Sequence, residues 1–184
     1  MREEKQRLFV AVELPEDLRH TLAGLQKNLP GIRWTSPNSL HLTVRFIGEV
    51  PPAQTTTIKT ALNNVKAERF TLQVNGLGSF DKKIHGVLWV GILASMDLFS
   101  LKWQVDTALE RHADLKMTDG RFSPHITLGR IKQADQKILR NFVAKNESII
   151  STEFSVRSFT LFSSILAPDG AIHTIEARYD LGSI

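Results

Sequence analysis

Two histidines stand in the same short pattern, each followed two positions later by a threonine: His41 with Thr43, and His125 with Thr127. In a strand, residues two positions apart point to the same face about 6.6–7 Å apart, so each imidazole would share a face with a hydroxyl. One neutral imidazole can take a proton from an attacking water while a second, protonated imidazole gives one to the leaving oxygen. Hydroxyls beside them would donate hydrogen bonds to phosphate oxygens. The paired pattern therefore predicts cleavage of a phosphodiester.

The amino-acid composition excludes several other kinds of chemistry. The 184 residues include no cysteine, which excludes disulfides, thiolate nucleophiles, iron–sulfur clusters and cysteine-ligated zinc. Hydrophobic residues make up 42% and charged residues 23%, the usual proportions of a globular domain. The net charge of +4 is compatible with an anionic ligand. We expect an enzyme that works with histidine and hydroxyl groups and without a metal or other cofactor.

No segment of the sequence predicts a membrane span or an export signal. The longest apolar run, Val87 to Ala94, is far shorter than the ~20 residues that cross a bilayer. The amino-terminal residues are charged and contain no long apolar stretch before Pro15. We therefore expect a cytoplasmic protein, and no feature of the sequence indicates an obligate dimer, so a monomer is expected.

Both histidine motifs are predicted to lie on strands, the first over residues 40–46 and the second starting at Pro124. In the first strand the apolar residues alternate with polar ones, which places Leu42 toward a core and His41 away from it. The other expected strands cover residues 8–12, 69–74, 86–93, 154–162 and 172–179, with a glycine-rich turn at 75–78. Amphipathic helices are expected over residues 15–27, 97–112, from 51 to about 65, and from about 133 to about 143.

The order of these elements repeats along the chain. Each half has a strand, a helix, a strand that carries the His-x-Thr motif, a helix and a strand. Repetition on this scale predicts two similar lobes related by a pseudo-twofold axis, with the two motifs facing each other across a cleft. No linker separates the halves, so we expect a single bilobal α+β domain that spans residues 1–184.

The sequence resembles the two-histidine phosphoesterase superfamily and, within it, the RNA 2′,3′-cyclic phosphodiesterases, also known as 2′-5′ RNA ligases. The segments that carry the resemblance are RLFVAVELPEDLR, LHLTVRFIGEV and RFSPHITLGRI. It implies two lobes with an antiparallel sheet each, an active-site cleft between them, and hydrolysis of RNA 2′,3′-cyclic phosphate ends to 2′-phosphates. It further implies that His41 is the general acid, that His125 is the general base, and that Thr43 and Thr127 bind the phosphate. The spacing alone does not say which histidine is the acid.

Residues close to the motifs are weaker candidates. Arg130 comes five positions after its histidine, so a bend at Gly129 is needed to bring it to the cleft as a phosphate contact; otherwise it is a solvated surface arginine. Phe46 occupies the equivalent place after His41 and is expected to pack in the core. Arg45 shares the face of His41 on a regular strand, within reach of an RNA backbone.

Three further aromatic residues receive simpler predictions. Trp89 and Trp103 lie on apolar stripes and are expected in the core. His173 lies on the last predicted strand, near the expected cleft, but has no partner in the repeat.

Two other functions remain open. The substrate could be another cyclic phosphate, on a small nucleotide or on ADP-ribose. Alternatively, the protein could bind RNA ends without catalysis. The same site could also run in reverse, joining a 5′-hydroxyl to the cyclic phosphate. ATP is not needed for this reaction because the cyclic phosphate already stores the energy, and the chain correspondingly has no Gly-x-x-x-x-Gly-Lys-Ser/Thr loop.

Overall fold

The structure is a computed structural model that describes residues 5–82, 85–117, 121–146, 150–167 and 170–182. Its strands are β1 (Gln6–Glu13), β2 (Ile32–Trp34), β3 (His41–Val50), β4 (Phe70–Lys82), β5 (His85–Ile92), β6 (His125–Ile131), β7 (Ile150–Val156), β8 (Ser158–Ala167) and β9 (Gly170–Asp180). Its helices are α1 (Glu16–Ala23), α2 (Pro52–Leu62), α3 (Met96–Ala113) and α4 (Gln136–Asn146), with a short 3₁₀ turn, η1, at Pro37–Ser39.

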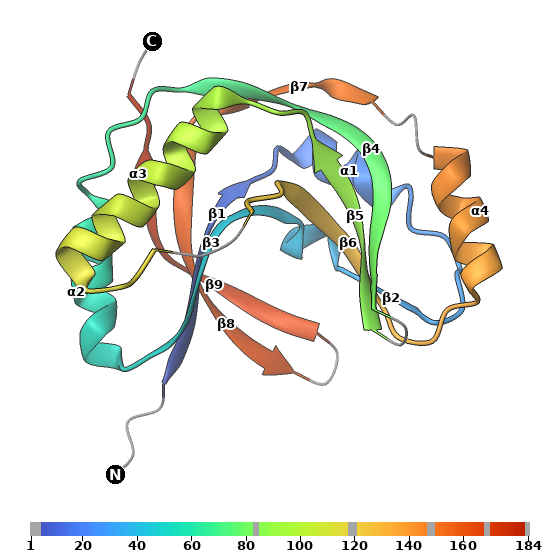
Figure 1. Ribbon diagram of the computed structural model, residues 1–184, viewed down its shortest axis with the longest axis horizontal. Helices are drawn as coiled ribbons and strands as arrows, with labels where there is room; N and C mark the ends of the chain where they lie inside the picture. Colours follow the sequence, from blue (N-terminus) through green and yellow to red (C-terminus); the bar gives the residue numbers. More distant parts are fainter. Residues whose placement is uncertain (1–4, 83–84, 118–120, 147–149, 168–169, 183–184) are drawn as a thin grey trace.

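The strands form a curled antiparallel sheet with the order β7-β4-β5-β6-β3-β1-β8-β9, and β2 pairs with β6. The first lobe contains β3, β1, β8 and β9, and the second contains β6, β5, β4 and β7. The two lobes meet where β3 pairs with β6, with Leu42 opposite Ile126. Helices α2 and α3 pack together at one end of the sheet, and α4 lies beside β4 at the other end (Figure 1). The expected bilobal α+β fold with antiparallel strands is confirmed.

The chain passes between the lobes rather than completing one before it begins the other. Strand β4 follows the first motif but pairs with β5 and β7 in the second lobe. Strands β8 and β9 follow the second motif but extend the first lobe, since β8 pairs with β1. Consecutive strands pair most readily with each other. Strand β4 therefore lies beside β5, in the second lobe. Each half of the sequence therefore contributes its last strands to the other lobe.

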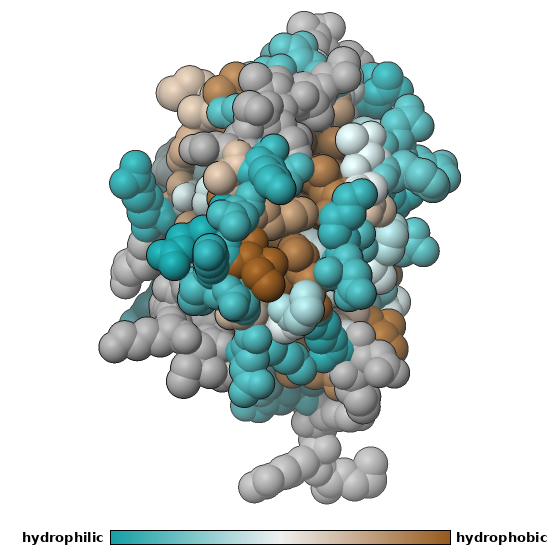
Figure 2. All heavy atoms as spheres, turned by 90° about the vertical axis from the view of Figure 1, so that its right-hand side faces the viewer, coloured by the Kyte–Doolittle hydropathy of each residue, from teal (hydrophilic) through white to brown (hydrophobic). Residues whose placement is uncertain are grey.

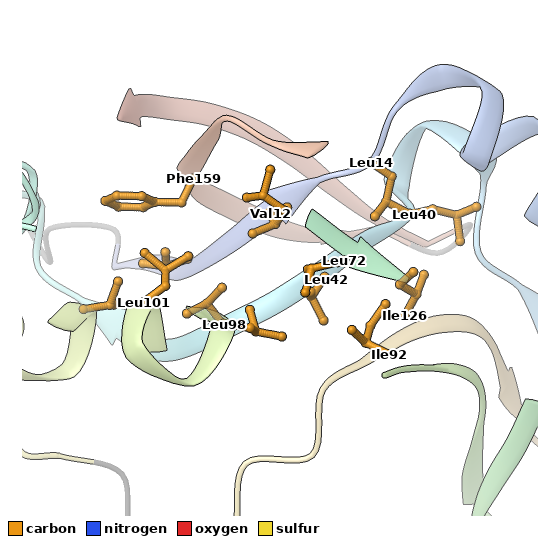
Figure 3. Close-up of a cluster of buried hydrophobic side chains, with 14 of the residues drawn as sticks. Val12, Leu14, Leu40, Leu42, Leu72, Ile92, Leu98, Leu101, Ile126 and Phe159 are labelled. Carbon is orange, nitrogen blue, oxygen red and sulfur yellow. The ribbon is translucent and has the colours of Figure 1, made fainter. Parts of the chain in front are cut away.

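The hydrophobic core lies against the face of the sheet opposite the two motifs' polar residues. Leu42 and Ile126, the middle residues of the two motifs, are both 0% exposed. They lie among side chains from β1 and α3, including Val12 and Leu98 (Figure 3). Burying one such side chain stabilises the fold by roughly 1.5–3 kcal/mol. The alternation within each motif thus anchors both strands through the residue between the histidine and the threonine.

Three expectations about the elements need correction. The glycine-rich segment 75–78 is not a turn, because it lies inside the long strand β4, where a bulge between Val74 and Leu77 contains Gly76 at φ +75°. The single strand expected over residues 154–162 is two strands, β7 and β8, separated at Arg157. The short strand β2 was not predicted, since its three residues carry too little pattern.

The prediction that Trp103 lies in the core was also wrong. Trp103 is largely exposed on α3, because Leu98, Leu101 and Val105 occupy the buried side of that helix. The face that carries α4 is mostly polar, with a small group of hydrophobic side chains exposed near its middle (Figure 2). Among the helices of the described residues, none is long and apolar enough to cross a bilayer.

Candidate active site

The two motifs lie side by side at the junction of the lobes. Because Leu42 is opposite Ile126 in an antiparallel pair, His41 lies beside Thr127 and Thr43 lies beside His125 on the same face of the sheet. Diagonal neighbours in such a pair are roughly 7–8 Å apart, which is the arrangement of the two histidines. The structure therefore brings together the four residues that the sequence singled out, on neighbouring strands rather than across a wide gap.

Both imidazoles are anchored in the same way. In each case Nδ1 lies 2.8 Å from the backbone carbonyl oxygen two residues earlier, that of Ser39 for His41 and that of Ser123 for His125. A carbonyl oxygen can only accept, so Nδ1 carries the proton and donates it. This bond selects the tautomer and leaves Nε2 of each ring available for proton transfer. A serine stands two positions before each histidine, but the acceptor is its backbone carbonyl, so no side-chain type in the sequence signals this anchor.

His41 lies against an aromatic cluster on the first lobe. Its ring centroid is 4.8 Å from that of Phe9 and 5.3 Å from that of His173, which meets it edge-on. The pKa of His41 is lowered to about 4, chiefly because burial desolvates the ring. The hydrogen bond to Ser39 opposes this shift, and electrostatic repulsion from His173 and His125 adds to it. His41 is therefore neutral at pH 7 in the free protein. The expectation that His173 lies near the cleft is confirmed.

His125 has different neighbours on the second lobe. The ring of Phe80 meets it edge-on at 5.3 Å, and the ring of Trp89 lies 6.4 Å away. Trp89 is opposite Thr127 in the sheet and is half-buried, so its prediction as a core residue was wrong. Its ring covers Gly78, where an added Cβ would come within 2.4 Å of it. The small size of Gly78 leaves room for the indole beside the site.

A bulge follows each motif and changes which residues face the site. In β3 the pairing with β1 shifts between Thr43 and Arg45, and in β6 the pairing with β5 shifts between Thr127 and Gly129. One extra residue reverses the side to which all later side chains point. Arg130 is consequently exposed on the face of His125, as the predicted bend at Gly129 required.

The same shift corrects the predictions for the residues after His41. Phe46 is 65% exposed on the face of His41, so the expectation that it packs in the core was wrong. Arg45 turns to the opposite side and is only 7% exposed, with its guanidinium 3.3 Å from the carboxylate of Asp106 on α3. It also donates to the backbone carbonyl of Lys116. Arg45 is therefore out of reach of a ligand in the cleft.

A cavity of about 590 Å³ opens beside His41. One wall is the segment before β3, including Asn38 and Ser39, and the other is the β8–β9 hairpin, including His173 and Ile175. His125 and Thr127 do not line it. Across the described residues, no group of three histidine or acidic side chains is placed to hold a metal ion. The reactive groups at the β3–β6 junction are the imidazoles of His41 and His125 and the hydroxyls of Thr43 and Thr127.

Comparison with known proteins gives consistent matches. The family model described as LigT like Phosphoesterase matches residues 12–89 and 98–173. The RNA 2′,3′-cyclic phosphodiesterase of Archaeoglobus fulgidus is 31% identical over 171 residues, covering 91% of this chain and 96% of the relative. The enzyme of the same name from Thermotoga maritima is 28% identical over 187 residues, covering 97% and 98%.

Solved structures show the same fold. E. coli LigT in its apo form is 25% identical, with a TM-score of 0.78 over 97% of this chain and 98% of that chain. LigT complexed with 3′-AMP is 25% identical, with a TM-score of 0.76 over 97% and 99%. A protein of Thermus thermophilus is 26% identical, with a TM-score of 0.78 over 95% and 97%.

Proposed function

The chain belongs to the family of LigT-like phosphoesterases, and we propose that it hydrolyses RNA 2′,3′-cyclic phosphate ends to 2′-phosphates. The observation that carries the proposal is the pairing of the two motifs at Leu42 and Ile126, with both histidines held in the same tautomer. Relatives that match nearly the full chain bear the name of this activity. The paired hydroxyls and imidazoles suit a single phosphate between them.

In the proposed reaction the cyclic phosphate lies over the β3–β6 junction. Thr43 and Thr127 donate hydrogen bonds to its non-bridging oxygens, where negative charge is held in the transition state. Nε2 of His125 takes a proton from water as the water oxygen forms a bond to phosphorus. The bond from phosphorus to the 3′-oxygen breaks, and Nε2 of His41 gives that oxygen a proton. The product carries a 2′-phosphate and a 3′-hydroxyl, and the two histidines have exchanged protonation states.

For His41 to act as the general acid, binding of the substrate must lead to protonation of its imidazole. With a pKa of about 4, His41 is neutral in the free protein at pH 7. A bound cyclic phosphate brings a negative charge into the site, which favours the protonated imidazole and raises the pKa of His41. Binding of the anionic substrate thus converts His41 to the protonated form that a general acid needs. A 5′-hydroxyl in place of water would give a 2′-5′ linkage by the same steps. We propose that Arg130, which is exposed on the side of His125, contacts the phosphate.

The decisive experiment is mass analysis of a short RNA with a 2′,3′-cyclic phosphate end. We expect the product to gain the mass of one water and to carry the phosphate on the 2′-oxygen. His41→Ala and His125→Ala should each lower kcat by ~10²–10⁴ while the affinity for the 2′-phosphate product changes little. His112→Ala, at an exposed histidine of α3, is the matched control and should leave kcat unchanged. No turnover by the intact protein would identify an RNA-end binding module instead, and a 3′-phosphate product would reverse the assignment of the leaving oxygen.

A further inference from the structure

Two arginines face each other on the cleft side of the sheet. Arg33 on β2 lies directly opposite Arg130 on β6. Residues that are opposite in an antiparallel pair point to the same face, so both side chains lie on the face of His125. Like charges placed directly opposite each other destabilise a sheet. The pair therefore lowers the stability of the folded protein unless an anion lies against it.

The neighbours of Arg33 show where its side chain points. Trp34, the next residue, lies on the other side of the sheet, where its ring meets that of Phe142 on α4 at 6.2 Å. Because side chains alternate along a strand, Arg33 points toward the cleft. At the start of β9, a Cβ added to Gly170 would lie 3.5 Å from Nη2 of Arg33. The guanidinium thus lies beside the β8–β9 hairpin of the first lobe.

Arg33 differs from the arginines that hold the fold together. Arg45 and Arg178 each form an ion pair with a carboxylate. Among the described residues, the ion pairs include neither Arg33 nor Arg130, and Nη2 of Arg33 is buried without a hydrogen-bond acceptor. A buried donor without an acceptor destabilises a folded protein. An acceptor supplied by an anionic ligand explains why an arginine occupies this position.

The guanidinium of Arg33 is too far from His41 to bind the phosphate that lies over the β3–β6 junction. The ring of His173 meets that of His41 edge-on at 5.3 Å. Gly170, beside Arg33, comes three residues before His173 on β9, roughly 10 Å away at 3.3 Å per residue. A charge-assisted hydrogen bond spans only about 2.7–2.9 Å. The acceptor for Arg33 must therefore be a second anionic group, farther along the substrate.

We propose that Arg33, opposite Arg130, binds a second phosphate of the substrate: the 5′-phosphate of the nucleotide whose 2′,3′-cyclic phosphate is cleaved. The inference rests on the proposed function. In an RNA chain this phosphate is the last internal phosphodiester, which a free 2′,3′-cyclic mononucleotide lacks. The planar fork of a guanidinium matches two oxygens of such a group. Arg33 therefore makes the protein select the ends of RNA chains over free cyclic mononucleotides.

The test compares two substrates that differ by one phosphate: 2′,3′-cyclic AMP, and the same nucleotide with a 5′-phosphate. For the intact protein, kcat/KM should be roughly ten- to hundredfold higher with the 5′-phosphate, the effect of a hydrogen bond to a charged group. Arg33→Gln should remove this preference and leave kcat/KM for 2′,3′-cyclic AMP unchanged. Arg33→Lys, which keeps the charge but not the fork, should retain part of it. Arg140→Gln, at an exposed arginine of α4, is the matched control and should keep the full preference.

Stability provides a measurement that does not depend on activity. Because Arg33→Gln removes one of two facing like charges, the midpoint of urea unfolding should stay the same or rise. A lower midpoint, together with an equal loss of kcat/KM for both substrates, would show that Arg33 is a structural residue and would overturn the proposal.

The outcomes separate the two proposals. If the intact protein hydrolyses neither substrate, the proposed function fails. If it hydrolyses both with the same kcat/KM, or if Arg33→Gln keeps the preference for the 5′-phosphate, the second phosphate site is overturned while the phosphodiesterase stands.

Discussion

Identical anchors hold two histidines in unlike surroundings. Both rings donate from Nδ1 to a carbonyl two residues earlier, so both present the same nitrogen to a ligand. His41 packs against Phe9 and His173, whereas the ring of Phe80 meets that of His125 edge-on. A repeated sequence motif therefore supplies the same functional atoms, and burial among its neighbours lowers the proton affinity of His41.

The protonation of His41 is open to direct measurement by NMR titration of its ring protons. In the free protein we expect a pKa of about 4, because the desolvated ring favours its neutral form. With the product 2′-AMP bound, the pKa should rise, because the phosphate brings a negative charge. A free-protein value near the ordinary 6.5, or no rise on binding, would contradict this account of the acid.

The same lowered pKa predicts how stability depends on pH. Between about 6.5 and about 4 the unfolded chain binds a proton at His41 that the folded protein does not bind. The free energy of unfolding should therefore fall as the pH is lowered through this window and become independent of His41 below it. Urea titrations of the wild type and of His41→Phe, which lacks this proton, measure the contribution. An equal decline for both proteins would show that His41 is not its source.

Arg130 offers a test of charge at the edge of the site. Because the bulge in β6 exposes it on the face of His125, Arg130→Gln should weaken binding of an RNA oligonucleotide with a cyclic phosphate end. Each lost phosphate contact lowers the slope of log affinity against log salt by about one. Arg140→Gln, at an exposed arginine of α4, is the matched control and should leave the slope unchanged. An unaltered slope for Arg130→Gln would mean that Arg130 makes no contact with a phosphate.

At the scale of the elements, the two bulges decide which side chains reach the cleft. Each comes directly after a motif, so the repeat extends to the backbone irregularity as well as to the histidine and threonine. The shift in β3 exchanges the places of two consecutive residues, exposing Phe46 on the cleft face and turning Arg45 into the contact between β3 and α3. Regular alternation along the strand predicts the reverse, with Phe46 in the core and Arg45 on the face of His41.

Arg45 should therefore act on stability and not on catalysis. Its partner Asp106 is buried and also pairs with Lys102, so removing the guanidinium leaves a buried carboxylate less well compensated. We expect Arg45→Met to lower the free energy of unfolding by about 3 kcal/mol, measured in urea, with kcat/KM of the folded protein unchanged. The double variant Arg45→Met with Asp106→Leu should be less destabilised than the single one. Loss of activity without loss of stability would mean that Arg45 acts in the active site.

At the scale of the whole molecule, the two lobes share one sheet and one core. Strands β3 and β6 pair at Leu42 and Ile126, and the main hydrophobic cluster includes residues of both lobes. The exchange of β4, β8 and β9 between the halves of the sequence further ties the lobes together. We propose that residues 1–184 form a single domain that unfolds as one cooperative unit.

That proposal predicts a single unfolding transition in urea. Tryptophan fluorescence, which reports on Trp34, Trp89 and Trp103, and far-UV circular dichroism should give the same midpoint. Two separated transitions, or different midpoints for the two probes, would mean that the lobes unfold independently.

The sequence by itself determined the chemistry and the local orientation. The repeated His-x-Thr motif, the absence of cysteine and the alternation that buries Leu42 and Ile126 are properties of residue type and of the period of a strand. Only the tertiary structure decided the register that joins β3 to β6, the exposure of Phe46 and the cavity beside His41. The physical reason is that a register and a bulge depend on the partner strand, and one extra residue reverses the face of every side chain that follows.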